Sequence, residues 1–535
     1  MKSCFAALFA ALGILSAVPS AARDLPRLES KGGHHALIVD GEPYLVLGAQ
    51  VNNSSAWPAA MPKVWPVIDA LHANTVQVPI AWEQIEPEEG KFDFSFLDLL
   101  LDQARQHDKR LILLWFATWK NTSPSYAPAW VKLNNGRFPR MKDAEGKTHY
   151  ALSPFAESTL KADSKAFAAL MRHLAKVDAQ NTVITVQVEN EPGTYRSARD
   201  YSDTANRLFD GPVPSNIRSY FQKGPGTWKQ LFGRDAELYF HSWAVASYID
   251  KVAAAGKAEK ALPMYANAAL QSDPFTWQDP ATFASGGPSH AAIAMWKVSA
   301  PHIDWLSPDI YNPDSKAYMG FLDHYTRADN PLFVAETGNA KEYARYFFSA
   351  LGRAAIGFSP FGMDATGYAN FPLGAPRVSD DVIAAFGANY ELFAPMQRVW
   401  ARLAAEGKVH GVSEPGGEAA KQTQKIRLGK YVARVTYGRP QFGSDDPKGN
   451  PYPSGGIVIG ELGPNEFLVT GFHARVEFAL ANPGEDNLMF NRVEEGHYEN
   501  GKWVFDRLWN GDQTDYGLNF TSAKQVLRVS LASYR

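Results

Sequence analysis

Residues 183–192 read VITVQVENEP, and this stretch indicates the fold more clearly than any other part of the chain. Four of its first six residues are valine or isoleucine, which predicts a short buried strand. The strand runs directly into the polar cluster Glu189-Asn190-Glu191. Because an unpaired carboxylate at the end of a buried strand carries a large desolvation cost, folding alone does not explain this cluster. We therefore expect a strand that delivers functional side chains to a site.

Outward from this strand, residues 40–375 alternate short β-rich runs with helical patterns. Eight runs predict strands, at residues 45–50, 75–80, 111–116, 183–188, 262–265, 304–309, 332–335 and 355–358. Between them, apolar residues recur at helical spacing, as at Leu97, Leu100, Leu101 and Ala104. Eight strand–helix pairs predict an α/β fold, a (β/α)8 TIM barrel over residues 23–405, whose functional residues follow the strand ends.

The C-terminal part of the chain has a different periodicity. A long helix over residues 380–405 is expected to end the barrel, and residues 413–417, SEPGG, predict a linker. Apolar residues then alternate with polar ones, for example at Tyr431, Ala433, Val435 and Tyr437. The dipeptide Asn500-Gly501 favours a tight hairpin turn. These features predict a C-terminal all-β, sandwich-like domain over residues 415–535.

The first residues follow the layout of a secretory signal peptide. Lys2 precedes an apolar stretch over residues 5–15, and small residues follow up to Ala22. The apolar stretch is shorter than the roughly 20 residues that span a bilayer. We expect a signal peptide over residues 1–22, an exported protein in the periplasm or the medium, and no membrane attachment after cleavage. The only cysteine, Cys4, lies in this segment, so no disulfide or thiolate metal site is expected.

Composition excludes several partners. The chain has 53 Lys and Arg against 56 Asp and Glu, a net charge of -3, and no basic run that suits nucleic acid. It also lacks the spaced histidines of a zinc site, an acidic calcium loop and a phosphate-binding glycine loop. We expect no metal and no cofactor.

A second acidic residue follows a buried strand in residues 333–338, FVAETG, where the strand ends at Glu336. Glycoside hydrolysis with retention needs two facing carboxyl groups, one to protonate the leaving oxygen and one to attack the anomeric carbon. Either Glu191 or Glu336 alone is also compatible with a structural ion pair. Two such residues at the catalytic face of one barrel favour a catalytic pair.

These residues resemble the retaining glycosidases with (β/α)8 barrels. Residues 187–191, QVENE, and 193–195, GTY, look most like glycoside hydrolase family 35, the β-galactosidases. This resemblance implies that Glu191 is the acid/base, that Glu336 is the nucleophile, and that Asn190 holds the sugar 2-hydroxyl. Residues 82–94, WEQIEPEEGKFDF, carry a pattern shared by families 35 and 42.

The resemblance covers residues 30–400, and the β module resembles the C-terminal domain of a bacterial branch of family 35. That branch implies an exo-acting β-galactosidase with an oligosaccharide substrate, such as galactosylated xyloglucan fragments. The chain departs from the family pattern at Pro192 and at residues 115–121, WFATWKN. A family 42 β-galactosidase, a β-glucosidase, an α-L-arabinosidase and a non-catalytic carbohydrate-binding barrel are the alternatives.

Further substrate-binding candidates lie near the expected strand ends. The aromatic residues Trp82 and Trp119 could stack on a sugar face, and Asn121 belongs to the region that contacts galactose in family 35. Tyr311 follows the sixth strand, where its hydroxyl could hydrogen-bond the nucleophile and keep it ionised. Most aromatic residues are simply core residues, and Tyr311 is the best exception.

Overall fold

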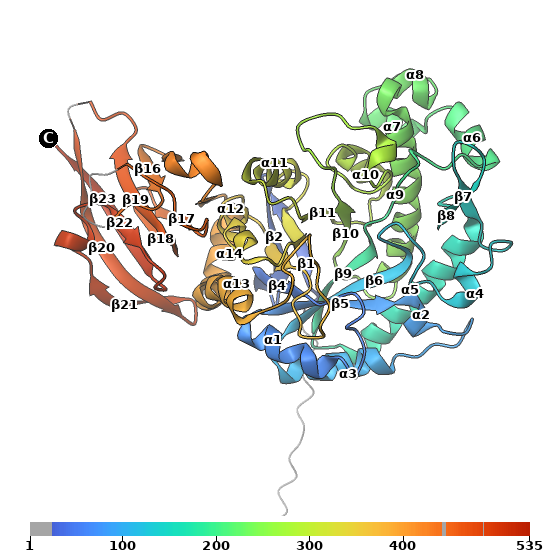
Figure 1. The fold of residues 1–535 in the computed structure, drawn as a ribbon, viewed down its shortest axis with the longest axis horizontal. Coiled ribbons are helices and arrows are strands. Elements are labelled where there is room, and N and C mark those ends of the chain that lie inside the picture. The colour runs from blue at the N-terminus through green and yellow to red at the C-terminus, as the bar shows by residue number, and fades with distance from the viewer. Residues whose placement is uncertain (1–23, 441–445, 485) are drawn as a thin grey trace, which may run out of the picture.

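The computed structural model describes residues 24–440, 446–484 and 486–535, so the predicted signal peptide lies outside the described residues. Eight parallel strands close into a barrel in the order β4, β5, β6, β9, β10, β11, β12, β13 (Figure 1). Their bounds are Val46–Gln50, Thr75–Ala81, Arg110–Lys120, Val183–Asn190, Met264–Ala269, Trp305–Ile310, Phe333–Thr337 and Gly357–Pro360. The predicted α/β fold, a TIM barrel followed by a sheet-rich domain, is confirmed.

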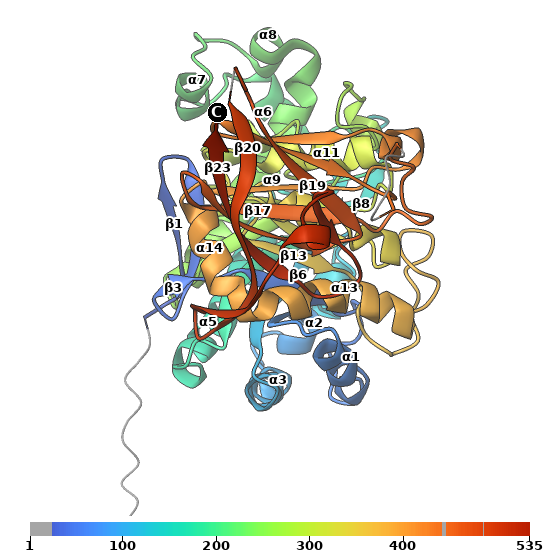
Figure 2. The same cartoon turned by 90° about the vertical axis from the view of Figure 1, so that its left-hand side faces the viewer.

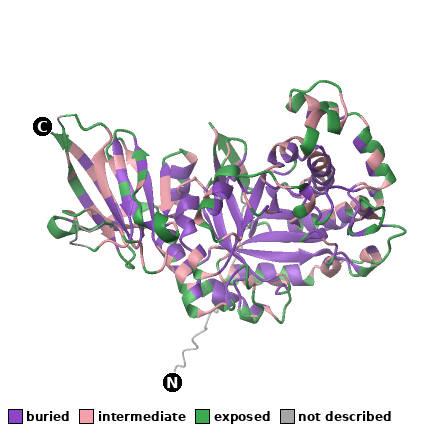
Figure 3. Cartoon of the chain, turned by 45° about the horizontal axis from the view of Figure 1, so that its top comes forward, coloured by how far each residue is buried: buried purple, intermediate pink, exposed green. Residues whose placement is uncertain are grey.

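Helices pack around the barrel by turning an apolar stripe toward the strands, as α3 shows. In α3 the residues Phe96, Leu97, Leu100, Leu101 and Ala104 are buried, at the three- and four-residue spacing of one helix face. The helices are α1 (Trp65–Ala70), α2 (Trp82–Ile85), α3 (Ser95–Gln106), α4 (Ala129–Lys132), α5 (Glu157–Val177), α6 (Asp203–Asp210), α7 (Ser215–Tyr220), α8 (Trp228–Phe232), α9 (Ala236–Lys257), α10 (Ile293–Ser299), α11 (Ser315–Tyr325), α12 (Tyr346–Leu351), α13 (Asp380–Phe393) and α14 (Gln397–Ala405). The barrel strands are buried along most of their length (Figure 3).

An N-terminal antiparallel sheet closes one end of the barrel. It consists of β1 (Arg27–Lys31), β2 (His34–Val39) and β3 (Glu42–Pro43). Leu37 and Val39 pack with the barrel-interior side chains of Ile112, Leu114 and Tyr265. The hydroxyl of the following Tyr44 lies 3.0 Å from the side-chain oxygen of Thr75, at the start of β5. This sheet therefore covers the N-terminal end of the barrel and leaves the opposite end for a site.

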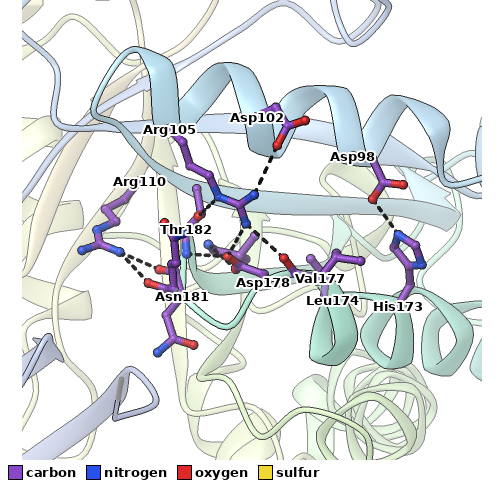
Figure 4. Close-up of polar contacts among 12 residues, drawn as sticks. Asp98, Asp102, Arg105, Arg110, His173, Leu174, Val177, Asp178, Asn181 and Thr182 are labelled. Atoms are coloured by element: carbon purple, nitrogen blue, oxygen red, sulfur yellow. Dashed lines mark hydrogen bonds and ion pairs between the residues drawn. The ribbon is translucent and has the colours of Figure 1, made fainter. Parts of the chain in front are cut away.

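Near the N-terminal ends of the barrel strands, polar contacts hold helices to strands. Arg105 of α3 donates to the buried carboxylate of Asp178 over 3.1 Å, as Figure 4 shows. Asp178 also accepts the backbone N–H groups of Thr182 and Val183, at 2.8 and 2.9 Å. Because the carboxylate is satisfied by several donors, its burial fixes the entry into β9.

The stretch between β9 and α9 contains the three helices α6, α7 and α8. Their apolar residues form a separate small core that includes Phe209, Ile217 and Trp228. This core packs on Phe240 of α9. Turn residues dominate the sequence pattern here and conceal the short helices.

The predicted long helix over residues 380–405 is interrupted. A 3₁₀ turn at Ala394–Met396 separates α13 from α14, because Pro395 has no N–H and clashes with the preceding turn. Beyond α14, the strand β14 (Val409–Ser413) pairs with β17 (Gly456–Gly463), so sheet structure begins before the expected linker. Glu414, inside that linker, is buried and accepts the N–H groups of Asn450, Ser454 and Gly455.

The C-terminal part contains two antiparallel sheets, which face the viewer in Figure 2. The strand order is β14-β17-β18-β23-β20-β21 in one sheet and β15-β16-β19-β22 in the other. Their remaining bounds are β15 (Gln424–Leu428), β16 (Tyr431–Thr436), β17 (Gly456–Gly463), β18 (Glu466–Phe472), β19 (Ala474–Leu480), β20 (Asn487–Glu499), β21 (Lys502–Leu508), β22 (Leu518–Phe520) and β23 (Val526–Tyr534). The predicted hairpin turn is confirmed, since Asn500 and Gly501 both have positive φ between β20 and β21.

The barrel and the sandwich share a hydrophobic core. Val458, Leu468 and Phe472 of the sandwich belong to the same buried cluster as Phe348 and Trp400 of α12 and α14. The rings of Phe348 and Phe472 lie 6.2 Å apart in an edge-to-face contact. Among the described residues, no helix combines the length and apolar character needed to cross a bilayer.

Candidate active site

A cavity of about 700 Å³ opens at the C-terminal ends of the barrel strands. Three carboxylic acids line it, namely Glu191 after β9, Asp309 in β11 and Glu336 in β12. One carboxylate oxygen of each lies within 4.8 Å of the other two. The wall is completed by Lys120 at the end of β6 and by loop residues, among them Asn53, Asn121, Tyr195, Gln271 and Tyr368. The barrel thus brings together Glu191 and Glu336, which the sequence places at separate strand ends.

Glu336 is held by two hydrogen-bond donors. Gln50, at the end of β4, donates its side-chain N–H to Oε1 over 2.7 Å. The Tyr311 hydroxyl donates to Oε2 over 2.6 Å, the contact that the sequence predicts for this tyrosine. Only 4% of Glu336 is exposed. Donors on both oxygens hold the carboxyl group in a fixed orientation, as attack on an anomeric carbon requires.

Glu191 has a different environment. Its backbone N–H donates to Oδ1 of Asn267 over 2.9 Å, and its side chain is partly exposed in the cavity. Burial, followed by the nearby charge of Glu336, raises the pKa of Glu191 to about 7, while the charge of Lys120 opposes this shift. Glu191 therefore keeps its proton in weakly acidic solution, as a general acid must.

The backbone around Glu191 is strained and tightly held. Glu189 and Glu191 have φ of 64° and 45°, and Asn121 and Thr122 opposite them have φ of 49° and 66°. Such left-handed conformations are uncommon for residues other than glycine and concentrate at functional sites. The N–H groups of Asn121 and Thr122 donate to the carbonyls of Asn190 and Glu191, both over 3.1 Å. These two bonds join the ends of β6 and β9.

Glu189, the first glutamate of the cluster, does not line the cavity. It is buried, and it accepts the backbone N–H groups of Thr118 and Trp119, at 3.3 and 2.7 Å. Burial and the adjacent Asp163 carboxyl raise its pKa well above the usual range. Its position under the β6 loop indicates a structural function.

The two asparagine candidates form part of a network beside the cavity. Asn190 is completely buried, and its amide nitrogen donates to Oδ1 of Asn121 over 3.3 Å. Its own Oδ1 accepts the side-chain N–H groups of Gln187 and Asn267, at 3.0 and 3.3 Å. Asn121 lines the cavity, whereas Asn190 lies behind it next to Glu191. Contact of either residue with a sugar stays a prediction.

The prediction that Trp82 and Trp119 bind substrate does not fit their positions. Both are completely buried and neither lines the cavity. Trp82 donates its indole N–H to Glu86 over 2.9 Å, and Trp119 packs edge-to-face on Tyr248 of α9 at 4.8 Å. Both rings belong to the main hydrophobic core cluster, so both are core residues.

Several residues of the site are not among the sequence candidates. Gln50, Asn267 and Asp309 each lie at or near the end of a barrel strand and point into the site. Lys120, only 6% exposed, supplies a positive charge near the carboxyl groups and donates to Oδ1 of Asn121. Their common signal is a polar residue that follows a buried strand, the same signal that identifies Glu191 and Glu336.

Comparison with known proteins places parts of this chain among glycosidases. Residues 56–254 match the model of glycoside hydrolase family 42, described as beta-galactosidase. Residues 386–521 match a domain of unknown function, DUF5597, which includes α14 and most of the sandwich. This match supports the predicted resemblance of the barrel to β-galactosidases. The family that matches is family 42, and membership of family 35 stays a prediction.

Two curated relatives carry the same description. A β-galactosidase of Xanthomonas manihotis is 25% identical over 268 residues, which are 44% of this chain and 41% of that protein. Beta-galactosidase 14 of Arabidopsis thaliana is 25% identical over 205 residues, 36% of this chain and 21% of that protein. The chain therefore matches less than half the length of either relative.

Solved structures of similar shape include the β-galactosidase from the psychrophilic Marinomonas ef1. It is 13% identical, with a TM-score of 0.49 over 67% of this chain and 61% of that one. The β-galactosidase from Bacillus circulans sp. alkalophilus is 12% identical, with a TM-score of 0.47 over 68% and 60%.

Proposed function

We propose that this protein is a retaining, exo-acting β-galactosidase in which Glu191 is the acid/base and Glu336 the nucleophile. The observation that carries the proposal is the unequal carboxyl pair at the C-terminal end of the barrel. Glu336 accepts one hydrogen bond on each oxygen, from Gln50 and Tyr311, whereas burial raises the pKa of Glu191 to about 7. Two titratable groups whose environments differ in this way suit one nucleophile and one acid.

The reaction follows from these two roles. Glu191 donates its proton to the glycosidic oxygen while an oxygen of Glu336 attacks the anomeric carbon, so the leaving alcohol departs and a glycosyl ester forms. Glu191, now a carboxylate, takes a proton from water, and the resulting hydroxide displaces Glu336. Two inversions give net retention.

The separation of the carboxyl groups supports retention over inversion. Retaining enzymes place the two groups about 5–5.5 Å apart, whereas inverting enzymes leave about 6.5–9.5 Å for a water molecule. Oxygen atoms of Glu191 and Glu336 approach within 4.8 Å of each other. This distance suits direct attack by the carboxylate.

The substrate that we propose is a terminal β-D-galactosyl residue on a plant cell-wall oligosaccharide, such as a galactosylated xyloglucan fragment. The resemblance to family 35 supports this choice, and export to the periplasm or medium is part of the same proposal. Tyr195 and Tyr368, which are 38% and 61% exposed, line the cavity and offer ring faces to the rest of the oligosaccharide.

A panel of nitrophenyl glycosides tests the proposed function. The β-galactoside should be hydrolysed far faster than the β-glucoside and the α-L-arabinoside, and NMR should show β-galactose as the first product. Preference for another glycoside would reject galactose as the sugar that is recognised and would leave the proposed mechanism in place. Lack of turnover on all of them would favour a binding protein.

The dependence of kcat/KM on pH should reflect the titration of Glu191. Because this residue must be protonated to act as an acid and burial raises its pKa to about 7, kcat/KM should fall as pH rises through about 7. The measurement is kcat/KM for a β-galactoside across the range from weakly acidic to alkaline pH. A profile that stays flat well into the alkaline range contradicts the role of Glu191 as acid.

Removal of the Tyr311 hydroxyl should slow turnover. Tyr311→Phe deletes a 2.6 Å hydrogen bond to the proposed nucleophile, and bonds to charged groups contribute about 1.5–3 kcal/mol, so kcat should fall by about 10- to 100-fold. Tyr343→Phe is the control, because the Tyr343 hydroxyl donates to the Tyr311 carbonyl instead of Glu336. Equal losses in both variants would indicate a packing effect.

A further inference from the structure

A third carboxyl group, that of Asp309, lies between the two proposed catalytic residues. Asp309 is in register with Glu336 on the neighbouring strand, and only 2% of it is exposed. Its Oδ2 accepts the side-chain N–H of Asn267 over 2.7 Å. Asn267 also accepts the backbone N–H of Glu191 over 2.9 Å. One asparagine therefore fixes Asp309 and Glu191 relative to each other.

The second oxygen of Asp309 has an unusual neighbour. Among the described residues, Oδ1 of Asp309 is buried without an N–H donor or a hydroxyl donor. An oxygen of the Asp309 carboxyl lies within 4.8 Å of an oxygen of the Glu191 carboxyl, so the two acids face each other across the site. Two ionised carboxylates cannot form a hydrogen bond with each other, because both only accept. A proton on one of the two carboxyls would let them hydrogen-bond and would satisfy the buried oxygen of Asp309.

We propose that Asp309 is a positioning residue that stays in its neutral form and donates its proton in a hydrogen bond to the Glu191 carboxyl group. Asp309 is the better holder of the proton because it is more deeply buried, whereas Glu191 is partly exposed in the cavity. Burial, then the charge of Glu336, then that of Glu191 raise the pKa of Asp309 well above the usual range.

The other titratable groups around Asp309 do not supply enough positive charge to stabilise its ionised form. Lys120 is the cation that acts on it and favours its charged form, but the two neighbouring glutamates outweigh this single charge. Within the part of the chain that the structure describes, Asp309 also acts on phenols, which add no positive charge: Tyr195, Tyr265, Tyr311 and Tyr325.

This inference rests on the proposed function for its consequence. With Asp309 neutral, Glu336 is the principal negative charge in the cavity before reaction. After Glu191 has given its proton to the leaving group, the Asp309 O–H stabilises and orients the new carboxylate for the water step. Asp309 acts in this step through the Glu191 carboxyl group.

The first test needs no activity. A carboxyl with a raised pKa in the folded state binds a proton that the unfolded chain releases above about pH 4, so its contribution to stability falls as pH rises. Asp309→Asn removes this loss. At each pH, the melting temperature of the wild type is subtracted from that of the variant. This difference should increase by about 2 °C or more between about pH 5 and about pH 8. Asp102→Asn, at an exposed carboxylate, is the control and should show no such increase.

A temperature difference that does not increase with pH would overturn the neutral Asp309, even if the wild type proves to lack galactosidase activity. Absence of that activity alone would instead reject the proposed function.

The second test uses turnover of a β-galactoside. An asparagine amide imitates a neutral carboxyl, since it donates to Glu191 and accepts from Asn267. Asp309→Asn should therefore lose less kcat than Asp309→Ala, which should lose about 10-fold or more, and should leave the alkaline limb in place. An equal loss in both variants, or a downward shift of the alkaline limb in Asp309→Asn, would show that Asp309 acts as an anion.

Discussion

Glu336→Gln should abolish turnover of every β-glycoside that the wild type hydrolyses, with kcat reduced by at least about 10⁴-fold. An amide of the same shape cannot attack the anomeric carbon, so no glycosyl ester forms. The fold should survive, because the substituted side chain occupies the same space and its carbonyl oxygen can still accept from Gln50 or Tyr311. Substrate binding should persist, since the change removes a reacting group and leaves the cavity walls intact.

Three measurements separate loss of chemistry from loss of structure. Far-UV circular dichroism and melting temperature should match the wild type, and an oligosaccharide substrate should still bind by calorimetry. A 2-fluoro galactoside that traps the ester should label the peptide containing Glu336 in the wild type only. Glu342→Gln, outside the cavity, is the control and should keep full activity. More than a few per cent of wild-type kcat in Glu336→Gln would exclude Glu336 as the nucleophile.

The barrel could be predicted from the sequence because its strands are buried on both faces and read as continuous apolar runs. The strand ending at Glu336 is an example, since its predicted range, residues 332–335, differs from β12 by only one or two residues at each end. The N-terminal sheet could not be predicted in the same way, because β3 has only two residues and β1 is mostly exposed. Neither gives a clear periodicity.

The site was predictable where a residue type has few structural uses. Glu191 and Glu336 stand out, because a carboxylate at a buried strand end requires compensation. Gln50 and Asn267 occupy equivalent positions, but an amide there is unremarkable in folding terms. Asp309 was visible in the sequence as the end of a strand, yet its partnership with Glu191 depends on strands that only the closed barrel brings together.

The aromatic candidates show a second reason why part of the site could not be predicted from the sequence. Whether a ring enters the barrel mouth or the layer between strands and helices depends on which face of the strand it occupies. Trp119 extends β6 beyond its predicted end, and its ring turns toward Tyr248 of α9. Tyr311, one residue past β11, instead reaches the cavity. Sequence position near a strand end does not distinguish these two outcomes.

Glu191→Ala should separate substrates by their leaving groups. General acid catalysis contributes about 10²- to 10⁴-fold, and only a poor leaving group depends on it. Hydrolysis of an oligosaccharide or an alkyl β-galactoside should fall by that factor, whereas formation of the glycosyl ester from a dinitrophenyl β-galactoside should change little. The ester should then accumulate, because Glu191 also activates the water that cleaves it. A burst of dinitrophenol followed by slow turnover is the expected trace.

Addition of azide to the Glu191→Ala variant tests the acid/base role of Glu191 directly. The alanine leaves a space beside the ester that a small anion can enter, and azide needs no base to attack. Added azide should restore turnover of the dinitrophenyl substrate and give a β-galactosyl azide, since two inversions at the anomeric carbon retain its configuration. Glu189→Gln, at the buried glutamate two residues earlier, is a control that should gain nothing from azide. An α-galactosyl azide, or equal losses on both substrate types without rescue, would reject Glu191 as the acid/base of a retaining enzyme.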